Sequence, residues 1–156
     1  MIDRDNLPHR QSTLAIVINS KRKFLIVNKN AYKPDEWAFP GGGVDEDETS
    51  QQAVERELRE ELLSDKFEVL GKSQFTDQYE WPDETIQDVN YKKGKKFRGT
   101  KLTQFFVRFN GDEDEVRAGD GLRAVKWVDY TELKSHLIFD NQFESANQVI
   151  REFIKP

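Results

Sequence analysis

The sequence predicts one α/β domain in which two amphipathic helices enclose a mixed β-sheet, an α/β/α sandwich. Two short β-branched runs, residues 13–19 and 23–28, are separated by polar residues and are typical of a β-hairpin. Apolar residues recur at helical spacing in residues 49–63 and again in residues 143–154. The chain has 156 residues, 36 % of them hydrophobic, which suffices for one core but not for two. We therefore expect residues 1–156 to form a single domain.

The other segments complete this expected sheet. Residues 1–12 are polar and contain Pro8, so we expect a loose N-terminal arm before the hairpin. Residues 79–101 form a long polar segment, and residues 131–135 a short helical turn. Further short strands are expected at residues 37–39, 67–70, 74–79, 102–109 and 124–128, with a break at Gly71.

The first of the two helices carries the most informative side chains. Thr49 followed by Gln52 is the pattern of a capping box, which marks a helix start. Glu57, Glu60 and Glu61 are spaced i, i+3 and i+4, so their carboxylates share one side of the helix. Such a cluster suits a hard divalent cation, Mg²⁺ or Mn²⁺, which cancels the repulsion. The alternative is a solvated acidic face with interleaved arginines.

The residues before the helix favour the metal site. From Gly42 the chain runs five residues to Glu48, seven residues to Arg56-Glu57-Leu58, and one more to Glu60-Glu61. This spacing resembles the Nudix box, G-x5-E-x7-R-E-U-x-E-E-x-G-U with U an aliphatic residue, at every position from Gly42 to Glu61. The resemblance implies the Nudix fold, and it implies hydrolysis of a nucleoside diphosphate linked to another group.

The last two positions of the box depart from the family pattern. Leu63 stands where the family has Gly, and Ser64 where it has an aliphatic residue. That Gly closes the helix in the left-handed conformation. We therefore expect Leu63 to pack rather than cap, the helix to end differently near Ser64-Asp65, and the metal site to be kept.

The resemblance also implies roles for individual residues. Metals neutralise the charge of a pyrophosphate and lower the pKa of bound water, and any helix glutamate not engaged with metal could serve as the base. Glu48 would brace the loop, and Arg56 would orient a carboxylate of the box. The implied metal ligands are Glu57, Glu60, Glu61 and a backbone oxygen of Gly41 or Gly42.

The second half of the chain resembles one branch of the family, the asymmetric diadenosine polyphosphate hydrolases and bacterial RNA 5′-pyrophosphohydrolases. Gly41 and Thr100 stand where that branch usually has Gln. That branch tends to have a glutamate shortly before its Trp-Val strand, as a further metal ligand or base. Asp120 is the nearest acid in this chain, but its side chain is shorter and it lies one position away. The resemblance to the branch rests on residues 79–82, 96–99 and 104–109.

Residues outside the box are expected to contact the substrate. Tyr79 and Trp81 are candidates to stack on a base, with ordinary core aromatics as the alternative. The basic residues between Lys92 and Lys101 stand out in an acidic chain, and we expect them to attract an anionic substrate. The alternative is a solvated loop. The candidate substrate-binding residues are Lys29, Tyr79, Trp81, Lys95, Lys96 and Arg98.

Composition excludes several other classes of function. The net charge of −5 argues against stable DNA binding. Without cysteine the chain has no disulfide framework and no thiolate zinc site, and His9 and His136 lack ligand spacing. No apolar run approaches the ~20 residues of a membrane span, and no signal-peptide pattern is present. We expect a cytoplasmic protein without a membrane partner and leave its oligomeric state open, a homodimer included.

The expected function is Mg²⁺-dependent cleavage of a dinucleoside polyphosphate or of 5′-triphosphorylated RNA. The alternative within the same class is a nucleoside triphosphate or nucleotide-sugar hydrolase, because generic Nudix enzymes share the Pro40-Gly41-Gly42-Gly43 loop. An alternative from another class is a catalytically silent module that binds nucleotides. The altered Leu63-Ser64 pair supports that alternative, and the intact Arg56-Glu57 and Glu60-Glu61 pairs oppose it.

Overall fold

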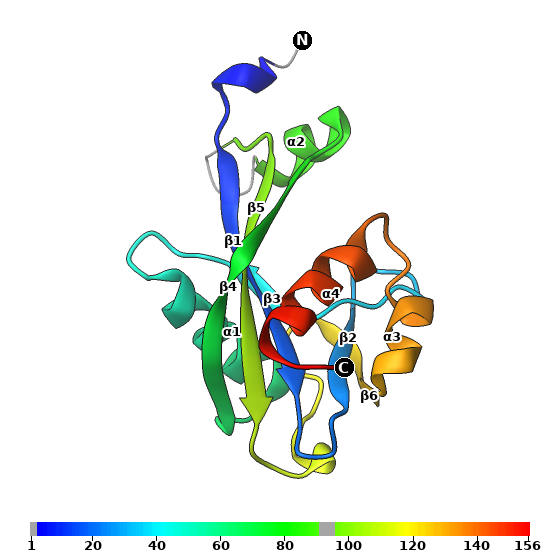
Figure 1. Ribbon diagram of the computed structural model, residues 1–156. Helices are drawn as coiled ribbons and strands as arrows, with labels where there is room; N and C mark the ends of the chain where they lie inside the picture. The colour runs from blue at the N-terminus through cyan, green and yellow to red at the C-terminus, as the bar shows by residue number, and fades with distance from the viewer. Residues whose placement is uncertain (1–2, 91–95) are drawn as a thin grey trace.

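The computed structural model describes residues 3–90 and 96–156, and its centre is a six-stranded sheet (Figure 1). The strands are β1 (His9–Ile18), β2 (Phe24–Lys29), β3 (Gly41–Gly43), β4 (Phe67–Glu80), β5 (Gly99–Phe109) and β6 (Leu122–Val128). They follow the order β4-β5-β1-β2-β6, and β3 pairs with β1 beside that path. β1 and β5 are parallel and the other pairs are antiparallel, so the sheet is mixed as predicted.

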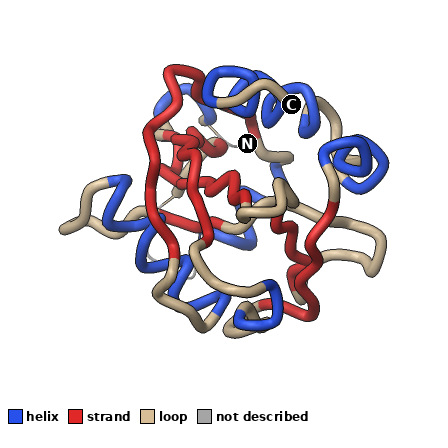
Figure 2. The backbone as a smooth tube through the Cα atoms, turned by 60° about the horizontal axis from the view of Figure 1, so that its bottom comes forward, coloured by secondary structure: helices blue, strands red, loops and turns tan. Residues whose placement is uncertain are grey.

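Helices cover both faces of this sheet (Figures 1 and 2). Successive side chains of a strand point to opposite faces, so Ala15 and Val17 pack with α1 (Ser50–Leu62), while Ile16 and Ile18 pack with α4 (Gln142–Phe153). α3 (Tyr130–His136) lies on the α4 side, and α2 (Asp83–Asn90) follows β4. The predicted α/β/α sandwich is confirmed. No helix of the described residues is long and apolar enough to span a membrane.

β1 begins earlier than expected. Residues 9–12 were expected in a loose arm, but they pair with β5 in a register that starts at His9 and Gly99. β5 itself starts three residues before the expected position, and it thereby provides the partner for these residues. The prediction of a loose arm is therefore wrong for residues 9–12. Residues 4–6 form a short 3₁₀ turn before the strand.

The segment after α1 also differs from the prediction. β4 is one strand of 14 residues whose register shifts near Gly71, where a break was expected. A Cβ on Gly71 would lie 2.6 Å from Cε1 of Phe153, so glycine lets α4 pack closely against the sheet. The polar residues after β4 include α2, which the sequence did not predict and which places Ile86 in the core.

The start of α1 is as predicted, but its end is not. Oγ1 of Thr49 accepts a hydrogen bond from the Gln52 N–H (3.1 Å), and Oε1 of Gln52 accepts one from the Thr49 N–H (2.9 Å). At the other end Leu63 adopts the left-handed conformation, φ 55° and ψ 36°, and donates its N–H to the Arg59 carbonyl. Its side chain is 57 % exposed. The expectation that Leu63 packs rather than caps is wrong, because Leu63 itself provides the left-handed cap.

Candidate active site

The glycine turn lies directly against the glutamates of α1. Pairing of Gly41–Gly43 with Ser12–Leu14 of β1 fixes the turn in place. A Cβ on Gly42 would lie 2.5 Å from the carboxyl carbon of Glu57, so no larger residue fits without displacing that carboxylate. The Gly41 N–H donates to Oε1 of Glu61 at 3.2 Å. The structure thus brings both candidate glycines together with two of the three candidate glutamates.

Arg56 is the centre of the acidic cluster. Its guanidinium donates to both carboxylate oxygens of Glu48, at 2.6 and 3.1 Å, and to the Gly43 carbonyl at 3.0 Å. It also reaches Glu57 at 3.1 Å and Glu60 at 3.2 Å. The hydrogen bonds from Arg56 lower the pKa of Glu48 to about 2, so Glu48 stays charged and ties the loop to the helix.

Glu61 is the buried member of the cluster, with 6 % of its surface exposed. Loss of hydration raises its pKa to about 7, and the neighbouring Glu57 adds to the rise. The charge of Lys29 and the N–H of Gly41 act in the opposite direction. Lys29, a candidate substrate-binding residue at the end of β2, therefore lies near the cluster.

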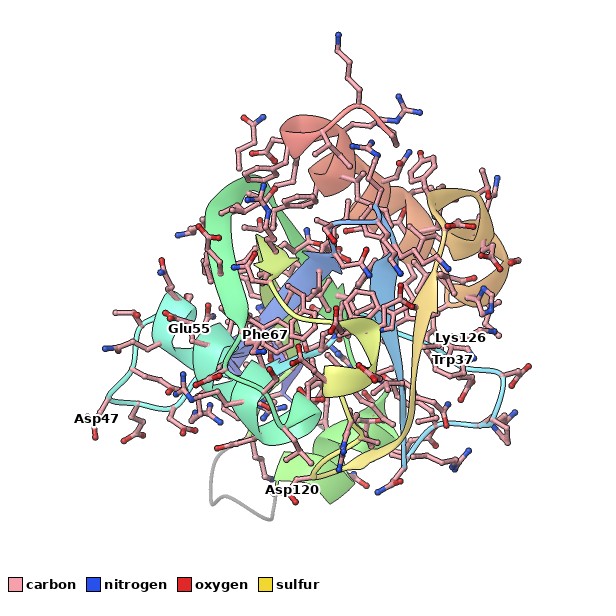
Figure 3. All side chains as sticks on the ribbon, turned by 90° about the horizontal axis from the view of Figure 1, so that it is seen from below. Trp37, Asp47, Glu55, Phe67, Asp120 and Lys126 are labelled. Atoms are coloured by element: carbon pink, nitrogen blue, oxygen red, sulfur yellow. The ribbon has the colours of Figure 1, made fainter. Side chains whose placement is uncertain are left out.

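A short strap, residues 117–120, closes the end of α1. The N–H groups of Arg117, Gly119 and Asp120 donate to the carbonyls of Leu62, Glu61 and Glu60, at 3.2, 2.6 and 3.4 Å. A Cβ on Gly119 would lie 2.9 Å from the Glu61 carbonyl oxygen and would overlap that of Glu60. Asp120, a candidate acid, is exposed beside the end of α1 (Figure 3). Its contact with α1 is made by its backbone N–H.

Two aromatic residues near Lys29 were missed by the sequence analysis. The amine of Lys29 lies 5.8 Å from the centre of the Tyr32 ring, which in turn meets the Phe139 ring edge-on at 5.3 Å. The pKa of Tyr32 is raised by burial and by the charges of Glu36 and Glu61, so Tyr32 belongs to the same region. An aromatic in a lysine-rich loop was the signal available for Tyr32; Phe139 is too distant in sequence to be connected with it.

The other candidate substrate residues lie at the far end of β4. The Trp81 indole donates to Oγ1 of Thr100 at 3.0 Å, and Arg98 forms an ion pair with Glu80, with Nε and Oε1 2.7 Å apart. Tyr79 is half exposed and Lys96 is exposed. Lys92, Lys93 and Lys95 lie outside the described residues. The structure therefore holds Trp81 and Arg98 in contacts within the protein and leaves Tyr79 open.

The donor chemistry of the acidic cluster suits a divalent cation. Among the described residues no three acidic or histidine side chains form a ready-made cage, because Arg56 bridges Glu57 and Glu60 while Glu61 faces Gly41. Three carboxylates beside a glycine backbone are nevertheless the oxygen ligands that Mg²⁺ prefers. The side chain of Glu60 is 50 % exposed, so it can turn toward a cation without disturbing the core. These residues fit a magnesium ion.

An α/β/α sandwich whose glycine turn rests on a helix of arginine-bridged glutamates is the architecture of a Nudix hydrolase. The model of the NUDIX domain matches residues 8–153, and the chain belongs to this family. The family match and the similarity to curated RNA pyrophosphohydrolases identify the protein as a Nudix pyrophosphohydrolase, an enzyme that hydrolyses a pyrophosphate linkage. Enzymes of this family generally use divalent metal ions, usually Mg²⁺.

Similar proteins support this assignment. The chain is 31 % identical to the RNA pyrophosphohydrolase of Gluconacetobacter diazotrophicus over 144 residues, which cover 85 % of this chain and 84 % of the relative. It is 28 % identical to that of Sphingopyxis alaskensis over 143 residues, 88 % and 89 % of the two chains. The Escherichia coli dihydroneopterin triphosphate pyrophosphohydrolase has a TM-score of 0.72 at 19 % identity, covering 92 % of this chain and 99 % of its own. A Caenorhabditis elegans Ap4A hydrolase complex has a TM-score of 0.63 at 15 % identity, covering 88 % and 93 %; both structures share the fold alone.

Proposed function

We propose that this enzyme cleaves a pyrophosphate linkage in a dinucleoside polyphosphate or in 5′-triphosphorylated RNA. The observation that carries the reaction is the cluster of Glu57, Glu60 and Glu61, held by Arg56 against the glycine turn. The choice of substrate is supported by the curated relatives, which are named RNA pyrophosphohydrolases and are matched over most of their length. The matched span, residues 8–153, supports one domain for the whole activity.

The chain's own residues would perform distinct tasks in this reaction. When bound, Mg²⁺, or Mn²⁺ in its place, would neutralise charge on the pyrophosphate oxygens and activate the attacking water. Glu57, Glu60 and Glu61 would hold it, with Arg56 keeping Glu57 and Glu60 in position. A glutamate of this set that is only partly engaged with the cation would accept the proton of the attacking water.

Two groups of residues, one near Glu61 and one beside Gly43, are suited to the nucleotide. Lys29, Tyr32 and Phe139 provide a cation and two aromatic rings on the side of Glu61. On the sheet, Tyr79, Thr100 and Arg10 occupy one row across β4, β5 and β1, so their side chains share a face. The Arg10 guanidinium lies over Gly43, where a Cβ would be 2.9 Å from its Cζ. A base stacked on an aromatic ring and phosphates near the cations would fit this arrangement.

The acidic net charge of −5 opposes stable DNA binding. A nucleotide substrate and a chain without cysteine also fit the reducing cytoplasm, where we place the enzyme.

A substrate panel tests the proposal. The purified chain is incubated with Mg²⁺ and one of four substrates: a dinucleoside tetraphosphate, a 5′-triphosphorylated RNA, a nucleoside triphosphate or a nucleotide sugar. We expect kcat/KM for one of the first two to exceed that for the last two by about tenfold or more. A preference for the nucleoside triphosphate or the nucleotide sugar would overturn the substrate assignment and leave the reaction class intact.

A further inference from the structure

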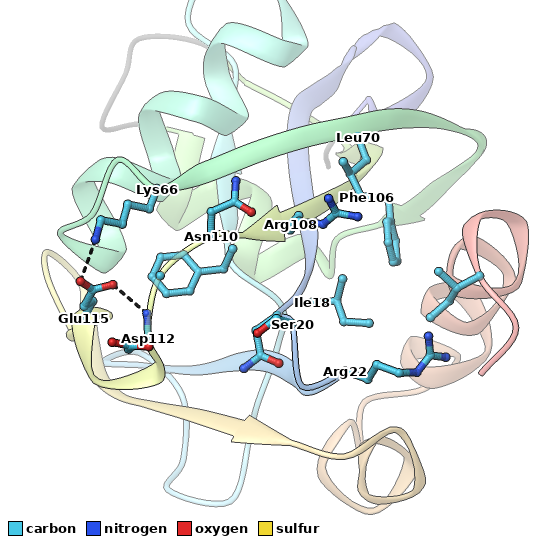
Figure 4. Close-up of a pocket in the computed structure, with 14 residues that line it drawn as sticks. Ile18, Ser20, Arg22, Lys66, Leu70, Phe106, Arg108, Asn110, Asp112 and Glu115 are labelled. Atoms are coloured by element: carbon cyan, nitrogen blue, oxygen red, sulfur yellow. Dashed lines mark hydrogen bonds and ion pairs between the residues drawn. The ribbon is translucent and has the colours of Figure 1, made fainter.

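A cavity lies at the end of β1 that is remote from the glycine turn. Its volume is about 680 Å³, and it opens where the β1–β2 turn, the end of β5 and the C-terminal segment meet (Figure 4). Ile18, Phe106 and Ile154 line it and belong to the core on the α4 side. Glu57, Glu60 and Glu61 are on α1, which covers the other face. The cavity is therefore separate from the active site.

The floor of this cavity is apolar and partly open to solvent. Ile18 and Phe106 are nearly buried, while Leu70 on the edge strand β4 is 39 % exposed at the rim. The volume falls within the range of about 300–1,000 Å³ that is usual for small-molecule sites. The aliphatic chain of a small ligand, a few carbon atoms long, would cover this apolar floor and remove it from water.

Two arginines stand on opposite sides of that floor. Figure 4 shows Arg108 beside Phe106 and Arg22 across Ile18 from it. Within the described residues neither guanidinium forms an ion pair, although the chain carries a net charge of −5. Glu68 faces Arg108 across the strands, but Oε1 of Glu68 accepts a hydrogen bond from Asn110 at 3.2 Å. The other cation of the cavity, Lys66, is bound to Glu115 at 2.7 Å.

The backbone and the hydrogen bonding of Arg22 fix where its guanidinium lies. Arg22 has φ 60°, a left-handed conformation at a position of the β1–β2 turn where glycine is usual. One Nη donates to the Lys155 carbonyl at 2.7 Å, which directs the guanidinium toward the rim of the cavity.

We propose that this cavity binds a small organic anion with an aliphatic body, either a carboxylate or a phosphate monoester. The aliphatic body would lie on Ile18, Leu70 and Ile154, and the anionic group would receive hydrogen bonds from Arg22 and Arg108. Guanidinium groups offer paired N–H donors that match both oxyanions. The site is independent of the hydrolytic reaction.

Titrations of the full chain test the proposal, with hexanoate and hexyl phosphate as probes and backbone amide chemical shifts as the readout. We expect saturable shifts for residues 18–22 and 106–110 and none for residues 41–43. Arg108→Gln should weaken binding about tenfold or more, because a hydrogen bond to a charged group is lost. The matched control is Arg151→Gln on α4, an exposed arginine outside the cavity, which should bind as the unmodified chain does.

Arg22→Gly separates binding from folding. It removes the guanidinium at a residue whose backbone conformation favours glycine, so it should weaken binding about tenfold while the melting temperature stays or rises. Acetate and hexylamine should show no saturable binding. Acetate lacks the aliphatic chain, and hexylamine lacks the anionic group. No saturable binding of either hexyl anion would overturn the proposal. So would equal binding of hexylamine, or unchanged affinity in both arginine variants.

Discussion

Leu63 shows how one residue can depart from a family pattern without altering the backbone. The family places glycine there, and the leucine adopts the same left-handed conformation that glycine would. Such a conformation costs a residue with a Cβ about 1–2 kcal/mol. Because the side chain is 57 % exposed, it recovers little of that cost through packing.

Leu63→Gly should therefore raise the free energy of unfolding by roughly 0.5–1 kcal/mol, the relieved strain being partly offset by the greater freedom of glycine in the unfolded chain. Urea denaturation monitored by circular dichroism measures the change. Leu63→Ala is the control, since it removes the side chain but keeps the Cβ, and it should give no such gain. A less stable glycine variant would show that the leucine side chain contributes packing after all.

Glu61 makes stability depend on pH. Its pKa is about 7 in the folded protein against 4.5 ordinarily, so the native state retains a proton that the unfolded chain loses. The free energy of unfolding should thus fall as pH rises from about 4.5 to 7, by up to roughly 3 kcal/mol. Glu48 is shifted in the opposite direction, so its contribution is lost only as pH falls from 4.5 toward 2.

Denaturation in metal-free buffer between pH 4.5 and 8 measures this slope. Glu61→Gln should flatten it, whereas Glu55→Gln, an exposed glutamate of the same helix, should leave it unchanged. If the Glu61→Gln variant kept the full slope, another buried group would have to be responsible.

The two ends of α1 show which element boundaries a sequence can predict. The start depends on Thr49 and Gln52, three residues apart, and was predicted. The end combines the left-handed cap at Leu63 with the strap of residues 117–120, more than fifty residues away, whose N–H groups satisfy the carbonyls of Glu60, Glu61 and Leu62. No local pattern connects these segments, so the strap could not be predicted. It fixes the turn of α1 that carries two candidate metal ligands.

Gly119→Ala tests the strap, because a Cβ at this position would overlap the Glu60 carbonyl oxygen. We expect a loss of about 1–3 kcal/mol of stability and weaker Mn²⁺ binding, measured by electron paramagnetic resonance of the free ion. Gly121→Ala is the control: a Cβ there would meet nothing within 4 Å, so Mn²⁺ affinity should be kept, while the positive φ of Gly121 (79°) gives this variant a stability cost of its own. Equal Mn²⁺ affinity in both variants would contradict a positioning role for the strap.

For the whole molecule, the sequence predicted the layers better than the contacts between them. Hydrophobic periodicity predicted the mixed sheet and its two covering helices, because that pattern is local. It missed α2, a mostly polar helix in which Ile86 is buried. The spacing of the box predicted which glutamates gather. The neighbours of that cluster, Tyr32, Phe139 and the strap, come from distant segments, and only the folded sheet brings them together.

The central claim is that the glutamates on this face of α1 hold a divalent metal that hydrolysis of the pyrophosphate requires. The most direct measurement is the rate of phosphate-bond cleavage as a function of Mg²⁺ for the unmodified chain, for Glu60→Gln and for Glu55→Gln. Glu60 bonds to Arg56 within the cluster, while Glu55 is exposed on the same helix and makes the matched control. We expect a Mg²⁺-dependent rate that falls about a hundredfold or more in Glu60→Gln and is unchanged in Glu55→Gln. Full activity in Glu60→Gln, or in the presence of a chelator, would contradict it.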